Sequence, residues 1–295
     1  MLIHKNKEMI YPKRVVIFGA SGFVGNAILS DMKLLDITVV GLGSNEINLV
    51  DENCTSQIEN ILKDGDTVIF VSAIAPAKNI EAIISNLKMI NNLKKVLNKI
   101  NFSHLIYVSS DAVYKDSEKM ISESNCAEPD SEHGLMHLCR EKLLISFSDR
   151  LAIIRPTLIY GLKDPHNGYG PNQFLRKIMS NEDITLFGKG EELRDHVSIN
   201  TVSLIIKNIL LWKSVGVINA VSGEGVRFKE IAEYMIQKLK SNSKIIETER
   251  VGKMPHNGYR LFNNKLLKAS FKNISILTWK EGIGLLCDQA IRKNG

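Results

Sequence analysis

Five short segments in the first 160 residues are almost continuously apolar and rich in β-branched side chains. They read RVVIFG, ITVVGL, DTVIFVSA, HLIYVSS and LAIIRP, and longer segments with apolar residues at helical spacing separate them. Continuously apolar segments are typical of strands buried on both faces, and their alternation with amphipathic helices predicts a parallel sheet covered by helices on both sides. We therefore expect an α/β fold built on a doubly wound parallel sheet.

The alternation becomes irregular after about residue 160. The segment YGLKDPHNGYGPN is rich in Gly, Pro and Asn and predicts a long loop. Further along, GVINAVS and SKIIET predict strands, and FKEIAEYMIQKLK predicts an amphipathic helix. We expect a core over residues 1–160 and a smaller lobe, interleaved with the core, over residues 161–295.

The composition is that of an ordinary soluble protein, with 44% apolar and 24% charged residues. The formal net charge of +6 suits anionic ligands such as phosphates, but it is small for a dedicated nucleic-acid binder, so we predict no nucleic-acid partner. The four cysteines have neither disulfide nor zinc spacing, the first residues are too polar for a signal peptide, and the longest apolar runs are too short to span a bilayer. These features indicate a cytoplasmic protein that binds no membrane.

A glycine-rich turn joins the first predicted strand to the helix that follows it. In VVIFGASGFVG, the glycines permit a tight turn at which a pyrophosphate can approach the backbone and the helix N-terminus. The spacing is GxxGxxG, one residue longer in its first gap than the common dinucleotide fingerprint, but its place between a strand and a helix favours the same use. We expect an NAD or NADP site whose contacts come from Gly19, Ser21, Gly22, Phe23, Val24, Gly25, Asp51 and Ala73.

The end of the second predicted strand leaves the choice between NAD and NADP open. An acidic residue there usually binds the ribose hydroxyls of NAD, and a basic residue usually binds the extra phosphate of NADP. This chain has Gly43 and Ser44 at that point. Asp51 can approach the adenine, although an N-cap of the following helix is an equally good interpretation.

Several motifs along almost the whole chain resemble the extended short-chain dehydrogenase/reductase family, a group of NAD(P)-dependent nucleotide-sugar epimerases, dehydratases and reductases. In order, they are GASGFVG, YVSSDAVY, IIRPTLIYG, HNGYGPNQFLRKI, ITLFGKGEELRDHVSI and GVINAVSGEGVRFKEIAEYM. The resemblance implies a Rossmann-type core that binds NAD(P), a C-terminal lobe that closes over a nucleotide sugar, and a homodimer formed through a helix pair. It also implies hydride transfer at a sugar carbon, in polysaccharide or activated-sugar biosynthesis.

The resemblance places Ser110 and Asp111 at the sugar. In the family, a Ser or Thr four residues before the Tyr of the VYG element binds the substrate oxygen, and Ser110 has this position relative to Tyr114. Asp111 follows it as in the sugar dehydratases. Ala112 stands where those enzymes usually carry Glu, which argues against dehydration.

The helix predicted for SEHGLMHLCREKLL departs from the YxxxK pattern of the family. When Glu141 is aligned with the Glu that follows the family's lysine, His133 takes the tyrosine position and His137 the lysine position. Histidine titrates near pH 6.5 in solution, so our hypothesis is that His133 acts as the base and that His137 binds the cofactor ribose. Two histidines one turn apart can also bind a metal, but Glu141 lies two turns from His133 and no other cluster is visible. We therefore predict no metal site.

The loss of both usual side chains leaves a second interpretation open. The chain would then be an NAD(P)-binding protein without catalytic activity, with a regulatory role or as the partner subunit of an enzyme. Both interpretations predict that the cofactor binds, so only turnover distinguishes them.

Three residues are candidates for binding the diphosphate of the substrate. The resemblance implies this role for Asn172 and Arg194, and Arg260 is a further candidate because a guanidinium can bind phosphate through two hydrogen bonds. A loop cap for Asn172 and salt bridges for the arginines are equally good interpretations. We expect Asn200 or Thr201 to cap the next helix. Five histidines have no spacing that suggests chemistry: His4, His104, His166, His196 and His256.

Overall fold

A seven-stranded sheet forms the centre of the protein, for which a computed structural model describes residues 2–272 and 274–294. The strand order is β1-β10-β6-β5-β4-β2-β3, and every neighbouring pair is parallel except β1 with β10. The strands are β1 (Leu2–His4), β2 (Arg14–Phe18), β3 (Thr38–Leu42), β4 (Thr67–Phe70), β5 (His104–Val108), β6 (Leu151–Pro156) and β10 (Ser214–Ala220). β3 and β4 pair with opposite edges of β2, so the sheet has the switch point at which doubly wound folds bind ligands.

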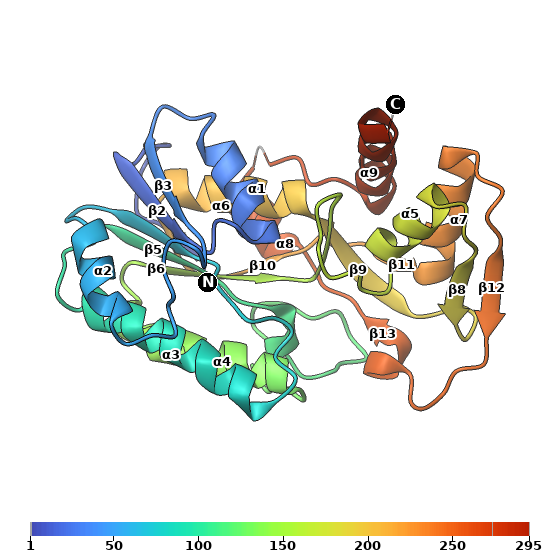
Figure 1. Cartoon of the computed structure of the whole chain (residues 1–295), viewed down its shortest axis with the longest axis horizontal. Helices are drawn as coiled ribbons and strands as arrows, with labels where there is room; N and C mark the ends of the chain where they lie inside the picture. The colour runs from blue at the N-terminus through green and yellow to red at the C-terminus, as the bar shows by residue number, and fades with distance from the viewer. Residues whose placement is uncertain (1, 273, 295) are drawn as a thin grey trace.

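Helices cover both faces of this sheet, as the sequence pattern predicts (Figure 1). On one face lie α2 (Cys54–Ile61), α3 (Ile80–Leu97) and α4 (Glu132–Leu144), and on the other lie α1 (Phe23–Met32), α6 (Ile199–Leu211) and α8 (Lys265–Ser270). Val15 and Ile17 of β2 pack toward α1 and α6, whereas Val16 and Phe18 pack toward α2 and α3, and all four are fully buried. Burial on both faces explains why the strand is continuously apolar.

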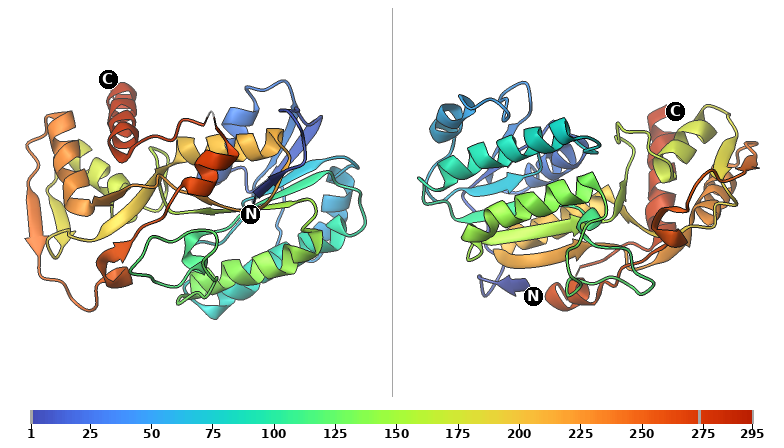
Figure 2. Two further views of the ribbon diagram at one scale, coloured as in Figure 1. Left: turned by 180° about the vertical axis from the view of Figure 1, so that it is seen from behind. Right: turned by 90° about the horizontal axis from the view of Figure 1, so that it is seen from below.

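Residues after 160 contribute to both parts of the molecule. β10, α6 and α8 belong to the core, and the remaining elements form a lobe beside it (Figures 1 and 2). The lobe contains β7 (Leu158–Tyr160), α5 (Pro171–Met179), β8 (Ile184–Phe187), β9 (Leu193–Ser198), β11 (Gly225–Arg227), α7 (Phe228–Leu239), β12 (Ile245–Thr248), β13 (Tyr259–Arg260) and α9 (Trp279–Asn294). Three short 3₁₀ helices, η1 (Asp111–Val113), η2 (Ile145–Phe147) and η3 (Pro255–Gly258), lie in the connections. Within residues 2–272 and 274–294, no helix is long and apolar enough to cross a bilayer.

Two local features differ from expectation. The polar first residues form β1, which adds an antiparallel edge to β10. The N-cap of α6 is Ser198, whose Oγ accepts a hydrogen bond from the Thr201 N–H at 3.0 Å, so the prediction of Asn200 or Thr201 is wrong. The reason is that the helix begins at Ile199, and both predicted residues already lie inside its first turn.

Candidate active site

Two adjoining hollows lie at the carboxyl ends of the parallel strands. The smaller, of about 250 Å³, is lined by the turn after β2 and by the segments after β3 and β4, and we call it the glycine groove. The larger, of about 600 Å³, extends from α4 to the lobe, and we call it the cleft. Val71 and Ala73 line both hollows, so the groove and the cleft meet at the end of β4.

The turn after β2 leaves no room for larger side chains. Gly19 has a φ of +93°, and a Cβ there would lie 2.7 Å from the backbone N of Ser72. A Cβ on Gly25 would lie 2.0 Å from the carbonyl oxygen of Gly19. Gly22 is the N-cap of α1 and supplies no side-chain cap, so the first amides of α1 are available to an anion. With Ser21 and Ala73 also lining it, the groove fits a dinucleotide cofactor.

Four of the eight residues expected around the cofactor do not line the glycine groove: Phe23, Val24, Gly25 and Asp51. Val24 lines the cleft, whereas the side chain of Phe23 lines a different hollow between α1 and α9. The structure therefore gives the Phe23 side chain no place in the glycine groove.

The end of β3 carries a carboxylate that the sequence pattern does not reveal. The Glu46 Oε2 accepts a hydrogen bond from the Gly43 N–H at 2.6 Å, which brings the acid back to the edge of the glycine groove. Asp51 does not line the groove, and its Oδ1 accepts a hydrogen bond from the Asn53 N–H at 2.9 Å. Asn53 is the N-cap of α2, so Asp51 occupies the turn before that helix.

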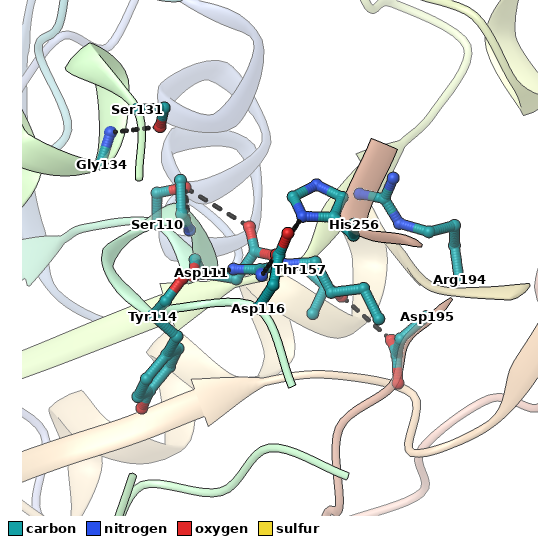
Figure 3. Close-up of polar contacts among 12 residues, drawn as sticks. Ser110, Asp111, Tyr114, Asp116, Ser131, Gly134, Thr157, Arg194, Asp195 and His256 are labelled. Carbon is teal, nitrogen blue, oxygen red and sulfur yellow. Dashed lines mark hydrogen bonds and ion pairs between the residues drawn. The ribbon is translucent and has the colours of Figure 1, made fainter. Parts of the chain in front are cut away.

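Helix α4 begins directly against η1, which brings its histidines to Ser110 and Asp111. The Ser131 Oγ accepts a hydrogen bond from the Gly134 N–H and caps the helix (Figure 3). A Cβ on Gly134 would lie 2.0 Å from the carbonyl oxygen of Ala112, so only glycine allows this approach. Ser110, Asp111, His133 and His137 all line the cleft.

The two histidine rings meet edge to face, with centroids 4.7 Å apart. The Ala77 N–H donates to the Nδ1 of His133 at 3.4 Å, and an amide can only donate, so a neutral His133 carries its proton on Nε2. The Nδ1 of His137 lies 2.7 Å from the hydroxyl oxygen of Tyr107. Among the described residues, this nitrogen is the hydrogen-bond partner of the hydroxyl. When the Tyr107 hydroxyl donates to Nδ1, the proton of a neutral His137 is on Nε2.

Burial keeps both rings neutral. It lowers the pKa of His133 and holds the pKa of His137 well below its ordinary value, and the charge of Arg140 acts in the same direction on both. Arg140 is completely buried beneath them, where its guanidinium lies 5.3 Å from the Tyr107 ring centroid and donates to the Ser72 carbonyl at 2.7 Å. The neutral ring of His133 therefore presents an N–H donor, and that of His137 does so in the tautomer to which Tyr107 donates.

A buried ion pair fixes α4 against the sheet. The two oxygens of Glu141 accept hydrogen bonds from Nε and Nη2 of Arg155 on β6 at 2.9 and 2.6 Å. The Ser109 hydroxyl donates to the same carboxylate at 2.6 Å. These contacts tie the helix to the ends of β5 and β6, next to Ser110.

Arg260 is fully engaged by neighbouring acids. Its Nε donates to Asp111 at 2.9 Å, its Nη1 donates to Asp116 at 2.8 Å, and its Nη2 donates to the carbonyl oxygens of Asp111 and Tyr114. With 2% of its surface exposed, Arg260 orients Asp111 and has little capacity left for a phosphate. Asp116 also accepts a hydrogen bond from His256 (Figure 3). Nothing in the local sequence marks Asp116 or His256, because the two are 140 positions apart.

The other expected substrate residues also line the cleft. Arg194 is largely buried, and its nearest carboxylate is Glu192 at 3.9 Å, so its guanidinium is only weakly paired. The Asn172 Oδ1 accepts a hydrogen bond from the Gly161 N–H at 3.0 Å, which is the loop-capping interpretation of that residue. The Tyr169 ring packs among three phenylalanines of the lobe, and its hydroxyl accepts a hydrogen bond from the Phe187 N–H.

His196 lies on β9 two residues beyond Arg194, and its ring also lines the cleft. Both ring nitrogens lack a hydrogen-bond partner among the described residues, and burial lowers the pKa of His196 to about 3. In the part of the chain that the structure describes, no group of three His, Cys, Asp or Glu residues is arranged to hold a metal ion.

A sequence model of the NAD dependent epimerase/dehydratase family matches residues 15–221. Among curated relatives, a protein of Methanocaldococcus jannaschii named as a putative UDP-glucose 4-epimerase is 26% identical over 92% of this chain and 94% of its own length. A Bacillus subtilis protein named as an uncharacterized UDP-glucose epimerase is 22% identical over 67% of this chain, and the match spans 65% of that protein. Methionine adenosyltransferase 2 subunit beta of Xenopus laevis is 25% identical over 50% of this chain and 48% of its own length.

Solved structures show the same fold. The UDP-glucose 4-epimerase of Thermus thermophilus, in complex with NAD, superposes with a TM-score of 0.81 at 18% identity, over 93% of this chain and 98% of that one. Its likeness supports the Rossmann-type arrangement of the core beside a smaller lobe.

Proposed function

Because the chain belongs to the NAD dependent epimerase/dehydratase family, we propose that it is a nucleotide-sugar epimerase or reductase that acts by hydride transfer at a sugar carbon. The observation that carries this proposal is the convergence of Ser110, His133 and His137 where the glycine groove meets the cleft. The two relatives named as UDP-glucose epimerases support a nucleotide sugar as the substrate.

The glycine groove would hold the cofactor, with its pyrophosphate at the N-terminus of α1. NAD or NADP, when bound, accepts or supplies the hydride. We propose that the Nε2–H of His137 donates a hydrogen bond to the ribose next to the nicotinamide. The hydrogen bond between the Tyr107 hydroxyl and Nδ1 holds the ring in this orientation. Glu46 favours NAD, because its carboxylate repels the extra phosphate of NADP.

At the sugar, Ser110 and His133 act as hydrogen-bond donors to the reacting oxygen. A carbonyl oxygen gains negative charge as it receives hydride, and fixed donors in a buried site stabilise that charge. With the Ala77 amide on its Nδ1, a neutral His133 does not accept a proton through Nε2, so we assign it as a donor in place of the base expected from its position. The proton that completes the reduction comes from solvent, and the same donors stabilise the alkoxide when the reaction runs as oxidation of a hydroxyl.

The test is turnover in both directions. The protein would be incubated with NADH or NADPH and 4-keto sugars linked to UDP, dTDP or GDP, and in parallel with NAD or NADP and the corresponding hydroxy sugars. Products would be followed by NMR. We expect a product in at least one direction with one of the three nucleotides. Cofactor binding without a product from any sugar would contradict the proposal.

A second candidate function has its own support. The chain lacks the Tyr and Lys of the family at 133 and 137, and one group of its relatives bears the name of a subunit of methionine adenosyltransferase. A cofactor-binding protein that acts as a subunit of another enzyme would bind NAD(P) and turn over no sugar.

We also infer a cytosolic homodimer. Support for the cytosol comes from the four cysteines, which are all unpaired, as is usual in a reducing compartment. Support for the dimer comes from α3 and α4, which lie side by side (Figure 2) and expose apolar side chains on their outer surface. These include Ile80, Ile84 and Leu135, with 59%, 47% and 47% of their surface exposed.

A further inference from the structure

Asp116 and His256 form a pair on the wall of the cleft that the proposed hydride transfer does not use. His256 lies in η3, and its Nδ1 bonds to Oδ1 of Asp116, in the segment after η1. Nη1 of Arg260 donates to the same oxygen at 2.8 Å. The side chain of His256 is 31% exposed and lines the cleft.

The Asp116 carboxylate determines which nitrogen of His256 faces the ligand. An ionised carboxylate can only accept a hydrogen bond, so Nδ1 of His256 carries a proton. In the neutral ring Nε2 therefore has a lone pair, and it has no hydrogen-bond partner among the described residues. This is the opposite of His133, which presents an N–H donor to the same cleft.

Two guanidinium groups and two carboxylates lie near His256. Arg260 pairs with both Asp111 and Asp116, so its single charge offsets that of one of the two acids. The guanidinium of Arg194 lines the cleft together with His256 (Figure 3), and its nearest carboxylate is that of Glu192, at 3.9 Å. Burial and the charges of Arg194 and Arg260 lower the pKa of His256, against the opposing effect of Asp116, so the ring is neutral near pH 7 before a ligand binds.

We propose that a diphosphate bound beside Arg194 is also held by His256 as an imidazolium, with one proton taken from solvent onto Nε2 as the ligand binds. This inference rests on the proposed function and states how the diphosphate of the nucleotide sugar is held. A neutral Nε2 would direct a lone pair at a phosphate oxygen, which is repulsive, whereas the protonated ring donates a charge-assisted hydrogen bond. The anion offsets the charge of Arg194, and Asp116 stabilises the imidazolium from behind.

The test measures proton uptake on binding. The protein, saturated with NAD so that the glycine groove is filled, would be titrated calorimetrically with UDP-, dTDP- and GDP-glucose in buffers of different ionisation enthalpy. These sugars are diphosphate diesters without a group that titrates near neutrality, so any proton taken up goes to the protein. We expect uptake approaching one proton per bound sugar nucleotide. The Kd should rise by up to about tenfold per pH unit as pH increases above about 7. Uridine, which has no phosphate, should bind without uptake.

Three variants locate the proton. His256→Asn should abolish the uptake and the pH dependence, and it should fold, because residue 256 has a φ of +54° that asparagine adopts readily. Asp116→Asn should reduce the uptake, because the imidazolium loses its carboxylate. His166→Asn, at an exposed histidine on the cleft without a side-chain partner among the described residues, is the matched control and should keep the uptake.

The outcomes separate this inference from the proposed function. Sugar-nucleotide binding without proton uptake, or uptake that survives in His256→Asn and disappears in His166→Asn, would overturn the role of His256 alone. Failure of all three sugar nucleotides to bind would overturn both the nucleotide-sugar function and this inference.

Discussion

His133 contacts a backbone amide that determines what its ring can do. If it donates a hydrogen bond to the sugar oxygen, His133→Phe should lower kcat for keto-sugar reduction by about 10²–10³-fold, the usual effect of losing one such donor. Cofactor affinity should not change. His133→Gln keeps a donor and should recover part of the rate. A base at this position would predict a different result: equal loss in both variants, and a parent kcat that falls in acid, as pH decreases through the pKa of His133, which burial lowers.

Glu46 should make the glycine groove selective for NAD. Its carboxylate lies at the end of β3, where an acid binds ribose hydroxyls and repels a 2′-phosphate. We expect NAD to bind more tightly than NADP, and Glu46→Gln to reduce this preference by roughly tenfold, a typical effect of one surface charge. Fluorescence titration with both cofactors measures the ratio. Asp51→Asn is the matched control, since the Asp51 carboxylate bonds to the Asn53 N–H before α2, whereas Glu46 bonds to Gly43 in the lining of the groove. A larger effect there would assign the selectivity to Asp51.

At the scale of the element, the position of α4 depends on one buried ion pair. Glu141→Gln leaves Arg155 without its counter-charge in a buried site, which usually costs about 3–5 kcal/mol of stability. Urea unfolding measures the change in the free energy of unfolding. Glu132→Gln, in the exposed first turn of the same helix, should cost less than about 1 kcal/mol. Equal losses in the two variants would mean that the pair does not hold the helix.

Local sequence patterns identify the elements that are regular and miss those that depend on distant partners. The apolar run of β2 and the histidine spacing of α4 are visible in the sequence because each involves only a few neighbouring residues. β1 has no such pattern, since a three-residue edge strand is defined by its pairing with β10. The cap of α6 was predicted two or three residues too late, because Ser198 also ends β9 and its extended backbone is set by that strand.

The same reasoning applies to the site. The glycine turn, Ser110 and the two histidines of α4 follow from short motifs, and the structure brings them to one groove and cleft. The contacts that decide their chemistry join distant segments. Ala77 determines the tautomer of His133 from 56 positions away, and Asp111 binds Arg260 across 149 positions. A single sequence contains no signal for such pairs. An arginine whose guanidinium binds an acid cannot be distinguished, from the sequence, from an arginine whose guanidinium is free to bind phosphate.

At the scale of the whole molecule, the outer surface of α3 and α4 is the face that we expect to join two copies. Pairing this face about a two-fold axis would bury Ile84 of α3 and Leu135 of α4 against the same helices of a second chain. Sedimentation velocity should show a dimer for the parent protein. The double variant Ile84→Glu/Leu135→Glu should be monomeric, because it places charges in the apolar interface. Leu34→Glu is the control: Leu34 follows α1 on the opposite face of the sheet and is 84% exposed, and its variant should stay dimeric. A monomeric parent, or a dimer that only Leu34→Glu dissociates, would exclude this interface and leave the two apolar helices to another partner.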